Sequence, residues 1–136
     1  MKSLQLTLIF IGIFTLGLYS FNSVYQDNIW VVPEEAENMK NPTDPEDKDD
    51  LAYGKSLYDK HCKSCHGKEG YGDGTKAAEL ETDPGDFSTE TFQAQSDGSM
   101  FYKTTEGRDD MPTFSKKIPD AEDRWLVVNY MKTLAE

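Results

Sequence analysis

The most specific motif in this sequence is the stretch Cys62-Lys63-Ser64-Cys65-His66. It holds both cysteines of the chain and one of its two histidines. Two thiols at this spacing, on adjacent helical turns, reach the two vinyl groups of a single haem and form thioethers with it. The histidine that follows the second cysteine then points its imidazole at the iron as an axial ligand. The pattern therefore predicts one haem c, attached through Cys62 and Cys65, with His66 bound to the iron.

Three other uses of neighbouring cysteines stay open on the sequence alone, and haem is favoured over each of them. A thioredoxin-like redox pair needs a βαβ context, whereas the sequence around the motif is helical. A structural zinc site would use both thiols with His61 and His66, which lie too close to the thiols for the usual spacing. A disulfide between Cys62 and Cys65 is the third alternative. His61, the other histidine, is expected to be a surface or edge residue that points away from the iron.

A haem iron that only transfers electrons needs a second axial ligand, and Met111 is the candidate. It follows Gly107 and precedes Pro112, which places it in a loop and allows its thioether to approach the haem face opposite His66. Pro112 also stiffens the backbone beside the ligand. Met100 is the rival ligand, but the helical periodicity around it indicates packing. The expected axial pair is therefore His66 and Met111.

The fold class predicted from the sequence is all-α, because no segment alternates convincingly as a strand. Asp49 or Asp50 is expected to cap the first helix and Asp97 the third. Gly54 lies inside the first helix at a cost of about 1 kcal/mol relative to Ala, which predicts a close helix crossing. The helices predicted from caps and periodicity are 49–61, 75–80, 98–106 and a last one that starts near Asp120.

From Leu51 to Ala135 the sequence resembles a class I, mitochondrial-type cytochrome c domain. Besides the cysteine motif, the strings that carry the resemblance are Gly54-x-x-x-Tyr58, Gly70-Tyr71-Gly72-Asp73-Gly74, Asp110-Met111-Pro112-x-Phe114 and Val127-x-x-Tyr130. The resemblance implies four to five short helices around one haem. It also implies that the first and last helices cross almost at right angles, with Gly54 and Tyr58 against Val127 and Tyr130. The Gly-rich loop, the Met-Pro string and the leader around Trp30 are also similar to single-haem cytochromes of bacterial respiratory complexes.

Three regions are expected along the chain. Residues 1–23 start with Lys2 and hold an apolar run at 4–21, which is typical of a signal peptide or of an N-terminal membrane anchor. Residues 24–50 are rich in acids and prolines and predict a linker, either a tether or an arm that follows the surface. Residues 51–136 form the predicted haem domain.

The formal net charge of −11 excludes nucleic acid as a partner, since phosphate binding needs a basic surface. Most of this charge lies in the linker, where 27–50 holds nine acidic against two basic residues. The haem domain, with 16 acidic against 11 basic residues, is only moderately acidic. We therefore expect redox partners that dock through a basic patch.

The function predicted from these features is electron transfer, not enzymatic catalysis. The chain would shuttle electrons between respiratory-chain partners in the bacterial periplasm or at the outer face of the cytoplasmic membrane. The alternative is a haem c subunit of a membrane-associated oxidoreductase complex, which the apolar run at 4–21 and the Trp30 segment favour. A gas-binding sensor with an open sixth position is a further alternative, and Met111 argues against it.

Overall fold

The structure is a computed structural model that describes residues 29–135. Residues from Val32 onward form one compact unit, whereas Ile29–Val31 are the described part of a separate unit. Ile29 and Val31 are strongly exposed. The predicted signal peptide or anchor at 1–23 lies outside the described residues. Within the described residues, no helix combines the length and the apolar character needed to cross a membrane.

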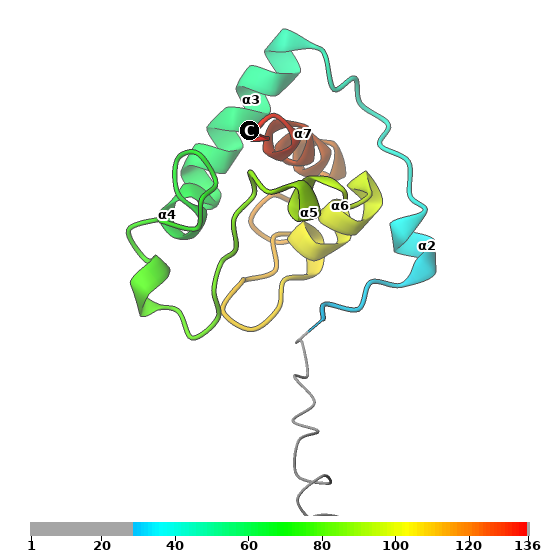
Figure 1. Ribbon diagram of the computed structural model, residues 1–136. Coiled ribbons are helices and arrows are strands. Elements are labelled where there is room, and N and C mark those ends of the chain that lie inside the picture. The colour runs from blue at the N-terminus through cyan, green and yellow to red at the C-terminus, as the bar shows by residue number, and fades with distance from the viewer. Residues whose placement is uncertain (1–28, 136) are drawn as a thin grey trace, which may run out of the picture. The chain divides into compact units, whose positions relative to one another are not determined.

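The compact unit is helical, which confirms the predicted fold class (Figure 1). Within residues 29–135 the only β-type pairing is an isolated bridge between Arg108 and Met111. The helices are α2 (Glu34–Glu37), α3 (Lys48–His61), α4 (Lys63–His66), the 3₁₀ helix η2 (Ala77–Glu79), α5 (Glu90–Gln93), α6 (Asp97–Glu106) and α7 (Ala121–Lys132).

Side-chain caps fix where the longer helices begin, and two of them differ from the prediction. The carboxylate of Asp47 caps α3, because it accepts hydrogen bonds from the N–H groups of Asp49 at 2.9 Å and Asp50 at 3.0 Å. Ser96, one residue before the expected Asp97, caps α6. Asp120 caps α7 as expected. In both corrected cases consecutive polar residues offered equivalent caps, so the pattern placed the helix within one to three residues of its start.

The crossing of α3 and α7 organises the unit. A methyl group added at Gly54 would meet the backbone carbonyl of Leu126, so the two helix axes approach as closely as the sequence predicted. One turn further along α3, the Tyr58 ring lies 5.1 Å from the Tyr130 ring. Val127 joins Tyr58 among the fully buried side chains. Burial of each such side chain stabilises the fold by about 1.5–3 kcal/mol.

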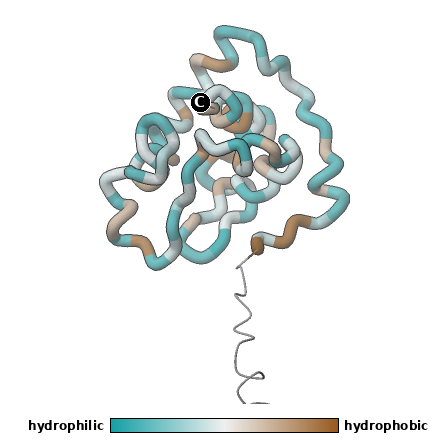
Figure 2. The backbone as a smooth tube through the Cα atoms, viewed as in Figure 1, coloured by the Kyte–Doolittle hydropathy of each residue, from teal (hydrophilic) through white to brown (hydrophobic). Residues whose placement is uncertain are grey.

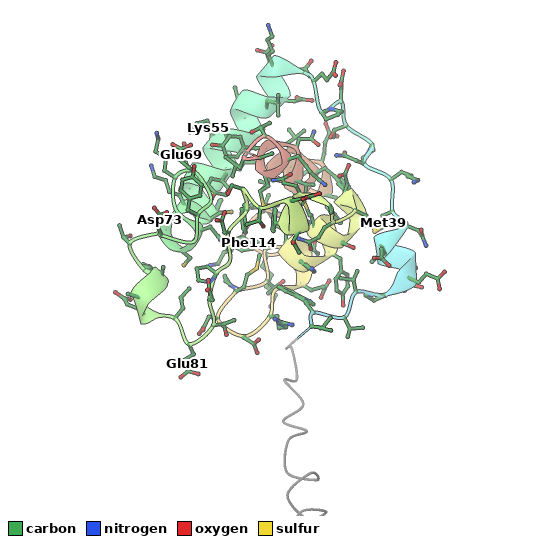
Figure 3. All side chains as sticks on the ribbon, in the orientation of Figure 1. Met39, Lys55, Glu69, Asp73, Glu81 and Phe114 are labelled. Atoms are coloured by element: carbon green, nitrogen blue, oxygen red, sulfur yellow. The ribbon has the colours of Figure 1, made fainter. Side chains whose placement is uncertain are left out.

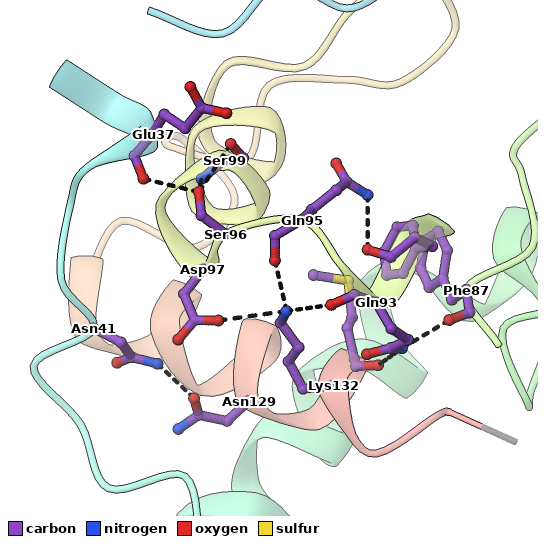
Figure 4. A network of polar contacts seen from close by, with 12 residues as sticks. Glu37, Asn41, Phe87, Gln93, Gln95, Ser96, Asp97, Ser99, Asn129 and Lys132 are labelled. Carbon is purple, nitrogen blue, oxygen red and sulfur yellow. Dashed lines mark hydrogen bonds and ion pairs between the residues drawn. The ribbon is translucent and has the colours of Figure 1, made fainter. Parts of the chain in front are cut away.

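The stretch 32–47, which we call the N-terminal strap, packs on the helices instead of extending from them. Its short helix α2 lies against α6, where a methyl group on Gly98 would collide with the Ala36 carbonyl. The Ser96 hydroxyl donates a hydrogen bond of 2.8 Å to the carbonyl of Glu37 (Figure 4). Part of the region expected as a linker therefore belongs to the compact unit.

A second contact holds the strap to α7. Asn129 is buried, and its side-chain oxygen accepts a hydrogen bond of 2.6 Å from the Asn41 amide (Figure 4). Its amide donates to the Thr43 hydroxyl at 2.9 Å, which closes a small ring of polar groups. The chain between α2 and α3 is otherwise largely hydrophilic (Figure 2). These few specific contacts, and not a broad apolar face, fix the course of the strap.

Candidate haem c attachment site

The cysteine motif forms a single helical turn at the end of α3. Cys62 ends α3 and begins α4, and its carbonyl accepts hydrogen bonds from the N–H groups of Cys65 at 3.1 Å and His66 at 3.0 Å. This turn brings the three predicted attachment residues together at the junction of the two helices. Both thiols are free; Cys62 is buried and Cys65 is half-buried.

The environment of Cys62 favours the neutral thiol. Burial, with a smaller contribution from the Cys65 thiol, raises the pKa of Cys62 to about 12. A thiol of this kind is a poor thiolate nucleophile and a poor thiolate metal ligand. In addition, no three His, Cys, Asp or Glu side chains gather as a possible metal site within residues 29–135. Neither the thioredoxin-like nor the zinc alternative gains support from this geometry.

His66 is half-buried, and its Nδ1 is a buried polar atom that needs a partner. Burial lowers the pKa of its imidazole to about 4, with a smaller opposing effect from the nearby Pro84 carbonyl. At neutral pH the ring is therefore neutral, which is the form that binds a metal. No hydrogen bond of good geometry reaches the buried Nδ1 atom, and the Pro84 carbonyl is close enough to the imidazole to favour its protonated form. If Nδ1–H is aimed at that carbonyl, Nε2 keeps the lone pair that an iron requires.

The loop after the motif folds back on it. The N–H of Gly72 donates to the His66 carbonyl at 2.9 Å, and the N–H of Gly74 donates to the Cys65 carbonyl at 3.2 Å. A methyl group at Gly74 would meet the Cys65 carbonyl at 2.6 Å. Glycine is therefore required at this position for the backbone to reach the motif. In Figure 3 this loop, which includes the labelled Asp73, lies beside α3.

Aromatic side chains surround the motif. The Phe87 ring lies 4.5 Å from the His66 ring, with 32° between the two planes. The Phe92 ring in turn stacks on the Phe87 ring, with 4.1 Å between the two ring centroids. The buried Tyr58 hydroxyl donates a hydrogen bond of 2.8 Å to the Gly67 carbonyl, just after the motif. The sequence did not single out Phe87, since nothing in its local pattern shows that it reaches His66.

The loop of Met111 is held at both ends. α6 stops at Gly107, whose φ of 68° favours glycine, and a methyl group there would meet the Met111 carbonyl at 2.5 Å. Beyond Met111, the N–H of Phe114 donates to the Thr104 and Thr105 carbonyls at 3.3 and 3.2 Å. Phe114 lies near the centre of Figure 3. The loop predicted from Gly107 and Pro112 is therefore present and anchored on α6.

The two candidate methionines differ in their surroundings. Met100 is 2% exposed and belongs to the core formed with Phe101 and Trp125. Met111 is half-buried and packs against the same core, of which Cys62 is also a member. Met100 therefore has a packing role that accounts for it, whereas Met111 lies in a loop at the edge of the core.

Arg124 is a buried residue near this loop that the sequence analysis missed. Its guanidinium donates to the Ile118 carbonyl at 2.6 Å and also to the carbonyls of Pro119 and Asp120. Its Nε donates to the Thr105 hydroxyl at 3.1 Å. Four hydrogen bonds compensate the burial of this charge. The signal in the sequence was the position of this arginine, directly before the apolar run Trp125–Val128 of α7.

The residues present fit a covalent haem. Two free thiols lie on one helical turn, the half-buried imidazole beside them has a buried Nδ1 without a hydrogen-bond partner, and a thioether lies in an anchored loop. Thioether, imidazole and thiol are the donors that haem c uses. On this set, Cys62 and Cys65 would hold the macrocycle, and His66 and Met111 would face its iron.

Comparison with known proteins gives the family. Residues 49–131 match the family model of cytochrome C oxidase, cbb3-type, subunit III. A chain of the reducing HAO-like protein complex of Kuenenia stuttgartiensis is similar in structure, with a TM-score of 0.64 and 30% sequence identity. The similarity covers 72% of this chain and 50% of that one, so the present chain spans about half of that neighbour. None of the curated proteins matches the chain.

The family match fixes the coarse function as well. A c-type cytochrome domain implies covalently bound haem and haem-based electron transfer. The motif at Cys62–His66 falls within the matched residues, as does Met111. Because the matched segment is more than half of the chain, the protein belongs to the family of cytochrome c oxidase, cbb3-type, subunit III, and is a c-type cytochrome.

Proposed function

We propose that this chain carries one haem c and transfers single electrons between protein partners. The haem supplies the ferric–ferrous couple when it is bound. The observation that carries the proposal is the half-buried His66, whose buried Nδ1 has no hydrogen-bond partner, on the same helical turn as two free thiols. In this proposal His66 and Met111 are the axial ligands, and Cys62 and Cys65 form the thioethers.

The residues around the site would determine the redox properties. A thioether opposite the imidazole raises the potential relative to a bis-histidine site. The Phe87 ring packs on the imidazole, and the Phe92 ring stacks on Phe87, so one side of the ligand is apolar. Apolar surroundings of this kind disfavour the extra positive charge of the ferric state and raise the potential further. We therefore expect a positive, cytochrome c-like potential.

Potentiometric titration of the haem-loaded protein tests this function directly. A single reversible one-electron transition at positive potential is expected, with a six-coordinate spectrum in both oxidation states. Carbon monoxide should bind poorly to the reduced protein at neutral pH, because Met111 occupies the sixth position. Rapid carbon monoxide binding would instead favour a gas-binding sensor with an open site.

We place the three regions as the sequence suggests, with a signal peptide or anchor at 1–23, an acidic segment at 24–50 and the haem domain at 51–136. This arrangement puts the haem domain in the periplasm or at the outer face of the cytoplasmic membrane. Support comes from the family, since cytochrome c domains of bacteria typically lie outside the cytoplasm.

A haem c subunit of a membrane-associated oxidoreductase complex is the second candidate function. Two observations favour it: the family is a subunit of an oxidase, and the similar solved structure is part of a protein complex. Size-exclusion chromatography of the native membrane extract separates the two. A shuttle migrates as a lone small species, whereas a subunit elutes with a large complex that contains the haem.

The charge of the chain supports partners that dock through a basic patch, in either role. With a formal net charge of −11, electrostatic attraction should speed the encounter with such a partner. The second-order rate of electron transfer is therefore expected to fall as salt rises from low to physiological ionic strength, because the Debye length shrinks from about 30 Å at 0.01 M to about 8 Å at 0.15 M. Stopped-flow measurements across this range check the sign, and a rate that rises with salt would indicate an acidic partner surface.

A further inference from the structure

One carboxylate joins the loop of Met111 to the loop that supports His66. The side chain of Asp110 accepts hydrogen bonds on a single oxygen, Oδ2, from the N–H of Glu81 at 2.8 Å and from the N–H of Thr82 at 2.9 Å. The two partners come from a segment 28 and 29 residues earlier in the chain. Hydrogen bonds to a charged acceptor are about twice as strong as those between neutral groups. Asp110 therefore fastens two distant loops at one point.

The loop on the Met111 side is a tight turn that aims this carboxylate. Arg108 and Met111 exchange both backbone hydrogen bonds, at 2.9 and 2.8 Å, and so close a turn with Asp109 and Asp110 at its tip. Asp109 has a φ of 51°, the only positive φ of a residue other than glycine within residues 29–135. Such a conformation is held only where its surroundings compensate for it. Because Met111 closes the same turn, a shift of Asp110 is also a shift of Met111.

The loop on the other side leads directly to the imidazole. Glu81 and Thr82 precede Pro84, whose carbonyl acts on the His66 imidazole. Three residues later the Phe87 ring packs on the His66 ring. The N–H of Phe87 donates to the Gly70 carbonyl at 2.7 Å, so this segment is also fixed to the loop after the motif. Figure 3 shows Glu81 at the outer edge of the unit.

We propose that Asp110 is a positioning residue, a latch that joins the Met111 loop to the His66 support loop and slows the release of Met111 from the iron. The proposal rests on the assignment of Met111 as an axial ligand. Release of the thioether requires the turn 108–111 to move outward, and that movement must break both hydrogen bonds to the 81–82 backbone. Without the latch, the turn opens more often and external ligands reach the iron sooner.

Three variants of the haem-loaded protein test the latch. In Asp110→Ala both hydrogen bonds are lost, whereas in Asp110→Asn a neutral oxygen can still accept them. Asp109→Asn is the matched control, because it removes the same charge one residue away and asparagine tolerates a positive φ; the ion pair of 3.2 Å that it loses to Arg108 is exposed and contributes little. Imidazole binding to the ferric protein, followed by stopped-flow absorbance, reports how often Met111 leaves. Amide hydrogen exchange at Glu81 and Thr82 reports the latch independently of the iron.

For Asp110→Ala we expect imidazole binding and exchange of the two amides to be faster by roughly tenfold, which corresponds to about 1.4 kcal/mol. Asp110→Asn should fall between Asp110→Ala and the parent, and Asp109→Asn should match the parent. The near-infrared Met–iron band should persist in all three. Unchanged rates in both Asp110 variants would overturn the latch, as would equal acceleration in Asp109→Asn, which would assign the effect to charge alone.

The latch and the axial assignment can fail separately. If Met111 is not the ligand, Met111→Leu keeps the near-infrared band, and the proposed function fails in that part whatever Asp110 does. If the band depends on Met111 but the Asp110 variants bind imidazole like the parent, the latch alone is wrong. Faster exchange at Glu81 and Thr82 without faster imidazole binding would likewise overturn the latch as a control on Met111 release.

Discussion

Replacing both thiols, Cys62→Ser together with Cys65→Ser, is expected to abolish covalent haem attachment completely. Serine keeps the size of the side chain but cannot form a thioether with a haem vinyl group, so the cofactor would be held by axial ligation alone. Haem staining after denaturing gel electrophoresis gives the measurement. The parent protein should retain its haem through denaturation, and the double variant should lose all of it.

The control for this experiment lies between the two cysteines. Ser64 is exposed, and its hydroxyl lies 3.9 Å from the Cys65 sulfur. Ser64→Ala therefore changes the same turn without removing a thiol, and it should keep covalent haem. Haem that stays with the denatured double variant would mean that the thiols are not the attachment points.

Loss of the thioethers should also lower the free energy of unfolding. The compact unit is small for an ordinary hydrophobic core, and small domains commonly depend on a covalent or metal staple. Cys62 is buried within the hydrophobic core, so a haem attached to it would be tied directly to that core. Denaturant unfolding of the double variant should therefore show a lower midpoint than that of the Ser64→Ala control.

Met111→Leu is expected to remove the near-infrared Met–iron band and to lower the redox potential. Leucine has a similar volume but offers no electron pair, so the sixth position would go to water or to another weak ligand. Axial ligands set haem potentials over a range of roughly 0.8 V, and a shift of tenths of a volt is expected here. Near-infrared absorbance and potentiometric titration measure the two effects.

Met100→Leu is the matched variant, because it makes the same substitution at the rival methionine. Met100 is 2% exposed in the core of α6, where a volume-conserving exchange costs less than about 1.5 kcal/mol. This variant should keep both the band and the potential. The reverse pattern, in which Met100→Leu loses the band and Met111→Leu keeps it, would exchange the roles of the two residues.

The helical framework could be predicted because its signals are local. Three local signals indicated α3, α6 and α7: a glycine that faces another backbone, a capping residue, and an apolar face that repeats with the helical period. Gly54 even predicted the close crossing, since a glycine inside a helix is costly unless something requires it. The exact caps were beyond this reasoning, because Asp47, Asp49 and Asp50 have nearly equal capping ability.

The features that the sequence left open or missed depend on contacts across the chain. Residues 32–47 carry prolines and acids, and their composition alone indicates a weak drive to fold. What holds them is supplied elsewhere, by the absence of a side chain at Gly98 and by the amide of Asn129. In the same way, nothing near Phe87 or Asp110 in the sequence shows that one packs on His66 and the other meets the 81–82 backbone.

The docked strap alters how far the haem domain can travel from whatever precedes it. Had residues 32–50 been a free chain, they would have added up to about 60 Å of extended reach. Because Ala36, Asn41 and Thr43 are held against α6 and α7, these residues cannot extend as a tether. Any tether can therefore consist only of residues up to residue 31. A shorter tether raises the local concentration of the domain near its attachment point and narrows the zone that it can search. The contacts at Gly98 and Asn129 therefore set the length of chain that is left to act as a tether for the electron carrier.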